Sequence, residues 1–260
     1  MPIRAAALAF GFVATTCVAN ERPNCFKGHH ADWHDENNWS DKVAPNQSGD
    51  SFVINQGNSA VVSAPFDGPI RLTVGNSRHS NPSGILTLNA DFQIEILRLA
   101  IEQNASGLVQ QTAGRSTFKT LLLASGLQGH EPTEAIYNLE GGTLSADDIQ
   151  IGLTGPASLN LSGSGEVVTA QKKLQIGSHA QLGFKGGKAG FPSVNGVVVT
   201  VEPGAVLRVE SDGTATKPGK FMLIHADLPL ATDFQVEWVG FAEGKAKLLE
   251  NEPGIVLEVK

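Results

Sequence analysis

The chain has 260 residues, of which 41% are hydrophobic, 17% charged and 6% aromatic. This composition is that of a folded protein and excludes a disordered or collagen-like chain. Glycine is frequent, with 29 residues, and Val, Ile, Leu, Thr, Ser and Asn dominate the rest, so we expect strands and tight turns. The net charge of −7 argues against a nucleic-acid partner, because neutralising phosphates requires a basic surface.

Residues 1–19 have the layout of a secretory signal peptide. Arg4 supplies a positive start, and residues 5–16 form an apolar stretch too short to span a bilayer. Residues 17–19 (CVA) end in a cleavage-like tripeptide, so we expect cleavage before Asn20. A buried N-terminal helix is the alternative. The signal predicts a mature protein that is extracellular, at the cell surface or periplasmic, with no transmembrane segment.

After cleavage, Cys25 is the single cysteine left in the chain. It cannot form an intrachain disulfide, and no C-x-x-C spacing indicates a structural zinc site. We interpret it as a half-buried thiol without function. Pairing between chains and metal binding are the alternatives.

Residues 20–50 are polar and irregular, and they contain Trp33 and Trp39. An open solenoid end exposes unpaired strand edges and apolar surface, so we predict that this segment is an N-terminal cap. The two indoles could stack on sugars, although packing over the first coil is the favoured interpretation. The segment also holds the densest set of metal-ligand types, at spacings that match no known template: His29, His30, Asp32, His34, Asp35 and Glu36. We expect a hydrated cap there and no metal.

Two apolar patterns recur through the middle of the chain. The first is a tetrapeptide of the form apolar-x-apolar-small, and its copies begin at Leu72, Leu97, Leu121, Ile149 and Leu174. The second is centred on Leu86, Val109, Tyr137, Leu159 and Leu182. Both advance by 22 to 28 residues and lengthen at the same repeat. A period of this size is the signature of a solenoid, in which each coil buries its apolar side against its neighbours.

Each repeat contains a glycine-rich corner and two or three short alternating runs of about four residues, with no credible helix. Hairpin signals such as Asn-Gly occur only after the repeats. The sequence therefore predicts an all-β fold, a parallel β-helix (β-solenoid) of roughly seven or eight coils over residues 51–216. With coils about 4.8 Å apart, the rod would be roughly 35 Å long. Residues 217–260 again alternate like strands and are predicted to form a C-terminal β cap.

A family resemblance rests on two stretches. The first contains Trp33, residues 38–40 (NWS), residues 44–45 (AP) and residues 49–50 (GD), and the second runs from Tyr137 to Gly152 through the repeat. Together they resemble secreted bacterial β-solenoid proteins with autotransporter-associated or PEP-CTERM-associated repeats. The resemblance covers most of the mature chain. It implies a surface or extracellular repeat protein and brings no catalytic residues.

The repeats differ in length mainly after the small residue of the first pattern, in residues 76–82 and 125–132. These loops should emerge along one edge of the rod, where solenoids usually bind ligands. The polar candidates there are Arg78, His79, His130 and Glu131. They join Trp33 and Trp39 as the weak ligand-binding candidates. Neutral drift of tolerant loops is the alternative interpretation.

Catalytic chemistry finds little support in the sequence. Asp147-Asp148 could form a carboxylate pair or a cation site, but adjacent residues of an extended chain point to opposite faces, and we expect a solvated corner. No calcium repeat, nucleophile motif, phosphate loop or dinucleotide fingerprint is present. We therefore expect no catalytic residues, no metal and no cofactor.

These features favour an exported, non-enzymatic β-solenoid that acts as a cell-surface, matrix or adhesion module. Its expected partner is an extracellular polysaccharide or a surface protein. The alternative is a carbohydrate-active β-helix, a lyase or hydrolase that binds or cleaves an extracellular polysaccharide.

Overall fold

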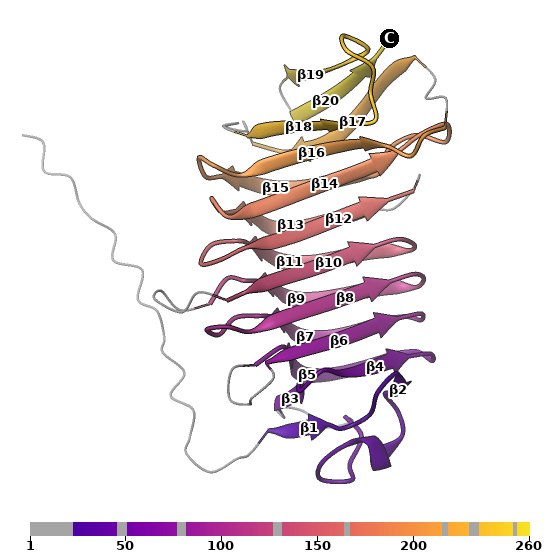
Figure 1. The fold of residues 1–260 in the computed structure, drawn as a ribbon, viewed down its shortest axis with the longest axis vertical. Helices are drawn as coiled ribbons and strands as arrows, with labels where there is room; N and C mark the ends of the chain where they lie inside the picture. The colour runs from indigo at the N-terminus through magenta and orange to yellow at the C-terminus, as the bar shows by residue number, and fades with distance from the viewer. Residues whose placement is uncertain are drawn as a thin grey trace, which may run out of the picture.

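A computed structural model describes residues 23–45, 51–76, 82–126, 132–163, 167–214, 218–228, 234–251 and 254–260. The predicted signal segment lies outside these residues. Figure 1 shows the fold as a stack of coils along one long axis. It is a parallel β-solenoid of about 8 turns, as the repeat predicted. Within the described ranges, no helix is long and apolar enough to cross a membrane.

Each coil contributes one strand to each of two sheets, which face one another across the core. The order of the first sheet, sheet A, is β1 (Asn24–Phe26), β3 (Ser51–Ile54), β5 (Phe66–Val74), β7 (Phe92–Leu99), β9 (Arg115–Leu123), β11 (Thr143–Ile151), β13 (Val167–Ile176), β15 (Ser193–Val201), β17 (Gly219–Ala226), β20 (Gly254–Val259) and β19 (Ala246–Asn251). The order of the second, sheet B, is β2 (Ala31–Asp32), β4 (Asn58–Val62), β6 (Ser83–Leu88), β8 (Ser106–Gln111), β10 (Glu134–Leu139), β12 (Ala157–Ser162), β14 (Ala180–Gly186), β16 (Val206–Ser211) and β18 (Gln235–Val239).

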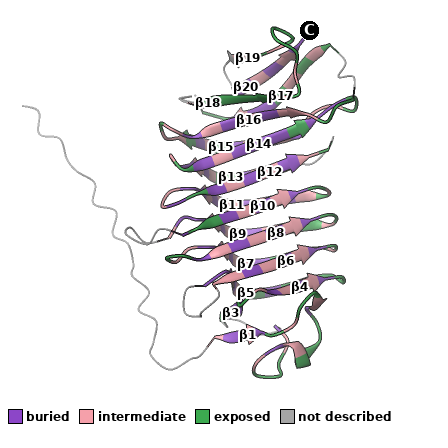
Figure 2. Ribbon diagram, viewed as in Figure 1, coloured by how far each residue is buried: buried purple, intermediate pink, exposed green. Residues whose placement is uncertain are grey.

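Both apolar patterns of the sequence are confirmed as ladders of paired residues. In sheet A, Leu123, Ile151 and Ile176 are direct partners in neighbouring parallel strands, and all three are fully buried. In sheet B, Tyr137 pairs with Val109 on one side and Leu159 on the other. Alternate residues point inward, as Figure 2 shows by the buried segments that recur on the strands. The core therefore runs along the axis of the rod.

Each repeat has two strands, within the predicted two or three, but the strands are longer than the predicted four residues or so. The sheet A strand is long because two predicted runs join into one. In β11 the join lies between Ala146 and Asp148, where the register with β13 shifts because β13 has one residue more. The irregularity does not end the ladder, and Leu144 and Ala146 before it and Ile149 and Ile151 after it all face the core.

The small residue that ends the first pattern lies at a tight corner after sheet A. In four copies it has a left-handed backbone, with φ of +78° at Gly75, +46° at Ala100, +44° at Ala124 and +65° at Gly152. A Cβ on Gly75 would clash with the backbone carbonyl of Ser106 in the neighbouring coil. The small side chain is thus required by the corner, because this conformation disfavours larger residues.

The two ends of the rod are built differently. At the N-terminal end, β1 and β2 are followed by a short 3-10 helix, η1 (Glu36–Asn38), and the chain returns across Phe26 through an antiparallel bridge with Trp39. At the C-terminal end, sheet A continues from β17 into the antiparallel strands β20 and β19, whereas sheet B ends at β18.

Candidate functional site

The four loop candidates of the sequence, Arg78, His79, His130 and Glu131, lie outside the described residues. The residues that flank the two loops can be placed. Asn76 follows β5 and Ser125 follows β9, so both loops leave the rod from the same type of connection between the sheets. Asn76 Nδ2 donates to Glu102 Oε1 at 3.0 Å.

Trp33 and Trp39 lie in the interior of the N-terminal cap, each with 0% of its surface exposed. Their rings meet edge to face with centroids 5.0 Å apart, and Trp39 Nε1 donates to the Trp33 carbonyl oxygen at 3.0 Å. Phe26 and Phe92 pack edge to face against the pair. Neither indole offers a ring face to a sugar in this structure, so both indoles pack over the first coil.

The polar residues of the cap do not converge. His34 Nδ1 lies 3.3 Å from Asp32 Oδ1, and Asp35 accepts a hydrogen bond from the backbone N–H of Asn37 as the N-cap of η1. Among the residues that the structure describes, no three histidine, cysteine or carboxylate side chains are grouped to hold a metal ion.

Asp147 and Asp148 lie at the bulge of β11, where both side chains are partly exposed. The bulge places both on the outside, so the expectation of opposite faces is wrong at this point of the strand. Asp147 Oδ2 lies 2.7 Å from Lys172 Nζ of the next coil. This ion pair neutralises one of the two carboxylates.

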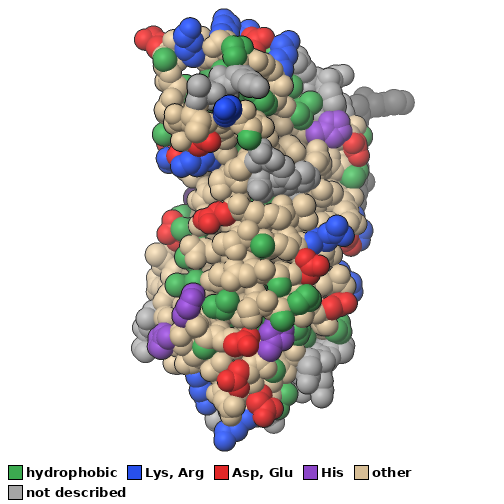
Figure 3. All heavy atoms as spheres, turned by 90° about the vertical axis from the view of Figure 1, so that its right-hand side faces the viewer, with side chains coloured by type: hydrophobic (Ala, Val, Ile, Leu, Met, Phe, Trp, Pro, Cys, Tyr) green, Lys and Arg blue, Asp and Glu red, His purple; other side chains and the backbone are tan. Residues whose placement is uncertain are grey.

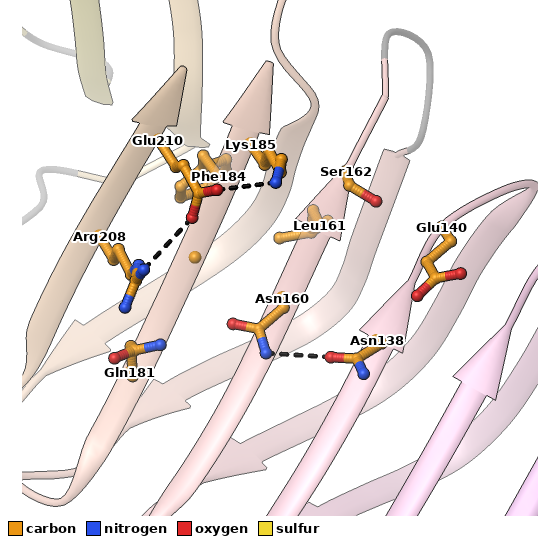
Figure 4. Close-up of a pocket in the computed structure, with 11 residues that line it drawn as sticks. Asn138, Glu140, Asn160, Leu161, Ser162, Gln181, Phe184, Lys185, Arg208 and Glu210 are labelled. Atoms are coloured by element: carbon orange, nitrogen blue, oxygen red, sulfur yellow. Dashed lines mark hydrogen bonds and ion pairs between the residues drawn. The ribbon is translucent and has the colours of Figure 1, made fainter. Parts of the chain in front are cut away.

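A hollow of about 330 Å³ lies on the outer face of sheet B, and Figure 4 shows the side chains around it. It spans the four neighbouring strands β10, β12, β14 and β16. Its floor is the backbone of β14 at Gly183. Its polar lining residues are Asn138, Glu140, Asn160, Ser162, Gln181, Lys185, Arg208 and Glu210.

One outward position of the sheet at the hollow has no side chain. Gly183 pairs with Asn160 on one side and Arg208 on the other, and Asn138 continues the row beyond Asn160. The pairing through Gly183 has no register shift. The three atoms nearest to a Cβ built on Gly183 all belong to Asn160, the closest being Oδ1 at 2.6 Å. The Asn160 amide therefore covers Gly183, which is buried.

Two asparagines form one wall of the hollow. Asn160 Nδ2 donates to Asn138 Oδ1 at 3.0 Å, which fixes the Asn160 amide on the sheet. Figure 4 shows its oxygen directed away from Asn138. This oxygen lies over Gly183, where it is an acceptor at the floor of the hollow.

Three charged residues form the opposite wall. Glu210 lies 2.7 Å from Lys185 Nζ and 3.3 Å from Arg208 Nη2. The hydrogen bond from Lys185 holds the pKa of Glu210 below its ordinary value, and Arg208 adds to the effect. Arg208 also lies 3.9 Å from Glu237 of β18. Glu210 is thus ionised at neutral pH and its charge is already balanced.

Glu140 is the second carboxylate at the hollow, but it lies at the far side. Glu140 directly follows Leu139 on the chain. Leu139 pairs with Leu161, Leu161 pairs with Phe184, and Phe184 pairs with the residue that precedes Glu210 on β16. The backbone positions of the two residues are therefore three strand spacings apart, about 14 Å. Glycoside hydrolysis uses two carboxyl groups roughly 5 to 9.5 Å apart. The backbone separation of this pair is larger.

The sequence contains a signal for this hollow. The second repeated pattern places Asn138, Asn160 and Gly183 at equivalent positions, directly after Tyr137, Leu159 and Leu182. A glycine in a row of amides marks missing volume only once the coils are known to stack in register.

A scan against protein-family models and searches of curated proteins and of solved structures find no match to this chain.

Proposed function

We propose that this protein is an exported, non-enzymatic β-solenoid that serves as a cell-surface, matrix or adhesion module. The outer face of sheet B at the Gly183 hollow is its contact surface. The resemblance to secreted bacterial β-solenoid proteins belongs to the same proposal. It supports an extracellular setting, in which a rigid rod displays a fixed surface to a polysaccharide or to a surface protein.

The single observation that carries the non-enzymatic part is the separation of Glu140 and Glu210. Their backbone positions are about 14 Å apart, farther than the roughly 5 to 9.5 Å between the paired carboxyl groups of a glycosidase, and this favours binding over cleavage. Glu210 is also kept ionised by Lys185 and Arg208, so it is a poor proton donor at neutral pH. The hollow is therefore better suited to holding a ligand than to cleaving one.

The surface seen from the side in Figure 3 supports the exclusion of nucleic acid. On the face shown in Figure 3, Lys and Arg side chains lie mostly toward the top beside Asp and Glu, and acidic side chains gather toward the bottom, so no continuous basic stripe is seen. A nucleic-acid contact would need a basic stripe to neutralise phosphates.

The second candidate function is a carbohydrate-active β-helix. The presence of two carboxylates in one polar hollow favours it.

An activity assay distinguishes the two functions. We expect the purified mature protein to bind extracellular polysaccharide or cell surfaces. It should release no reducing or unsaturated ends from plant, algal and bacterial polysaccharides. Turnover of any of these substrates, abolished by Glu210→Gln, would replace the first function with the second.

Export is tested separately, by sequencing the N-terminus of protein recovered outside the cytoplasm. We expect it to begin at or within a few residues of Asn20 and to carry one free thiol at Cys25. The Cys25 thiol is half-buried and its pKa is raised by burial, so slow reaction with thiol reagents at neutral pH is expected. Recovery of exported protein that retains Met1 would contradict the signal peptide.

A further inference from the structure

We propose that the Gly183 hollow binds a neutral, hydroxyl-rich oligosaccharide chain laid across strands β10 to β16. This inference rests on the proposed function and names the ligand class of that site. It places the contact on the outer face of sheet B, whereas the loop candidates of the sequence would place it at an edge.

The hydrogen-bonding groups of the hollow match hydroxyl groups. Asn138, Asn160 and Gln181 each carry a carboxamide, which both donates and accepts, as a sugar hydroxyl does. Asn160 Oδ1 is an acceptor at the floor. Gln181 lies two residues before Gly183 on the same face of β14. Neighbouring hydroxyls of one sugar could therefore bond to both amides at once.

The charges argue against an acidic ligand. Both cations at the hollow are already paired, Lys185 with Glu210 at 2.7 Å and Arg208 with Glu210 at 3.3 Å. Glu140 lines the hollow as well, and Glu237 lies 3.9 Å from Arg208. Two carboxylates, Glu210 and Glu237, thus lie beside the two cations, and an anionic sugar would have to displace Glu210 from its partners.

The shape of the hollow fits a chain rather than a single sugar. It crosses three strand spacings, about 14 Å, which is longer than one sugar ring. Gly183, in the middle of that span, is buried beneath the Asn160 amide, so a ring there would contact Asn160 Oδ1. The axis of the hollow runs along the rod, from β10 toward β16.

Binding at one hollow should be weak. Phe184, the aromatic residue at the hollow, points into the core with 1% of its surface exposed, so it provides no ring face for a sugar. We expect a dissociation constant of roughly 1 mM for a soluble oligosaccharide. Adhesion would then arise from many copies of the protein on one surface.

The decisive variant is Gly183→Asn, which places a side chain where the Asn160 amide lies. It extends the amide row from Asn138 and Asn160, and the atom nearest to its Cβ is Asn160 Oδ1, the end of a flexible side chain. We therefore expect the fold to be kept. Thr87→Asn is the matched control, because Thr87 lies on the same face and row of sheet B, opposite Gln110 and outside the hollow. Gln181→Ala is a second loss variant that adds no volume.

The measurement is an amide NMR titration of the mature protein with soluble oligosaccharides of known charge. The neutral probes are cello-, malto- and xylo-oligosaccharides, the acidic probe is oligogalacturonate and the basic probe is a chitosan oligomer. We expect at least one neutral probe to shift the side-chain amide signals of Asn160 and Gln181. Gly183→Asn should weaken this binding by about tenfold or more, whereas Thr87→Asn should leave it unchanged.

Several results would overturn the inference: no shift at these amides with any neutral probe, stronger binding of the acidic or basic probe, or equal binding by wild type and a folded Gly183→Asn variant. If Gly183→Asn does not fold, unchanged binding by Gln181→Ala would overturn it as well. The proposed function has a separate readout. Adhesion without shifts at the hollow rejects the hollow as the contact surface together with its ligand class but keeps the non-enzymatic adhesion function, whereas release of cleaved sugar in the same tubes rejects the non-enzymatic function.

Discussion

The core of the rod is covered to different degrees at its two ends. At the N-terminal end, Trp33 and Trp39 are 0% exposed, and the chain returns over β1 so that Ser40 N donates to the Cys25 carbonyl oxygen at 2.8 Å. At the C-terminal end, Val236 and Trp238 of β18 are each 40% exposed. The first end is covered by aromatic packing and backbone pairing, whereas the second leaves the last strand of sheet B open.

The two exposed residues of β18 occupy core positions. Val236 pairs with Leu207, and Trp238 pairs with Val209, and both partners are 0% exposed. The same inward row is thus buried in one coil and open in the next. What differs is whether another strand follows. The inward direction of a side chain is set by its own strand, but its burial depends on the neighbouring coil.

Substitutions in the middle of the rod give reference values for the loss of stability at either end. Ile151→Asp places a carboxylate in the fully buried ladder between Leu123 and Ile176, and we expect a loss of several kcal/mol or no folding. Gln150→Asp, one residue away and facing outward, should change the free energy of unfolding by about 0.5 kcal/mol or less. Urea denaturation of both variants measures the difference. Equal destabilisation would refute the register of the coils.

Replacing one tryptophan at each end tests the comparison directly. Trp33→Ala removes a fully buried indole from a cluster with Trp39, Phe66 and Phe92, and should cost about 3 to 5 kcal/mol. Trp238→Ala should cost about 1 kcal/mol, because its ring is partly in solvent and contacts Phe241 with centroids 5.8 Å apart. Thermal and urea denaturation give both values. A larger loss at Trp238 would mean that the open end is covered in solution.

Hydrogen exchange should separate the ends without any mutation. In the described structure, the backbone of β18 pairs with β16 alone, and its side chains are mostly exposed. We expect its amides to exchange much faster than those of β3 and β4, which lie between paired strands on both sides. Mass spectrometry of peptic fragments measures this. Comparable protection of β18 and β4 would contradict an open C-terminal edge.

The smallest expected effect is a pH dependence confined to the C-terminal end. Glu258 of β20 lies 2.8 Å from Lys247 Nζ on β19 and 3.8 Å from Lys220 Nζ on β17, with Lys260 also near. The hydrogen bond from Lys247 lowers the pKa of Glu258 below its ordinary value of 4.5. A lowered carboxylate pKa stabilises the fold above that ordinary value, and the contribution is lost as the pH falls below it.

We therefore expect the amides of β19 and β20 to exchange faster, relative to the rest of the rod, as the pH is lowered from 5 toward 3. Glu258→Gln should flatten this dependence while leaving the N-terminal end unchanged. The exchange rates are to be corrected for the intrinsic effect of pH. An equal acid response in wild type and Glu258→Gln would show that other carboxylates control this end.

Much of the fold could be predicted because the repeat carries two independent kinds of information. The alternation around Leu121 and Leu123 gives the inward face of a strand. The equal spacing from Leu121 to Ile149 and from Leu123 to Ile151 gives the partner of that strand in the next coil. The bulge of β11 could not be predicted in the same way. Asp147 interrupts the alternation, so the sequence reads as two short strands, whereas the ladder on both sides holds the segment together as one.

The candidate site was less accessible to sequence reasoning. Residue type alone drew attention to Trp33 and Trp39, but an indole in a cap is equally suited to packing, and both rings lie in the core. The hollow lies where one row of sheet B lacks a side chain, at Gly183. Its lining comes from four strands, and only their lateral stacking brings Asn160, Gly183 and Arg208 into one row.

By itself, the sequence determined the direction of the side chains and the partners of each strand, because both follow from a period of two within strands and a nearly constant period between coils. The tertiary structure decided which outward residues meet and how well each end is covered. Lys185 and Glu210 are 25 positions apart in the chain yet 2.7 Å apart in space. Burial, pairing of charges and missing volume depend on neighbours that the local pattern of one coil does not contain.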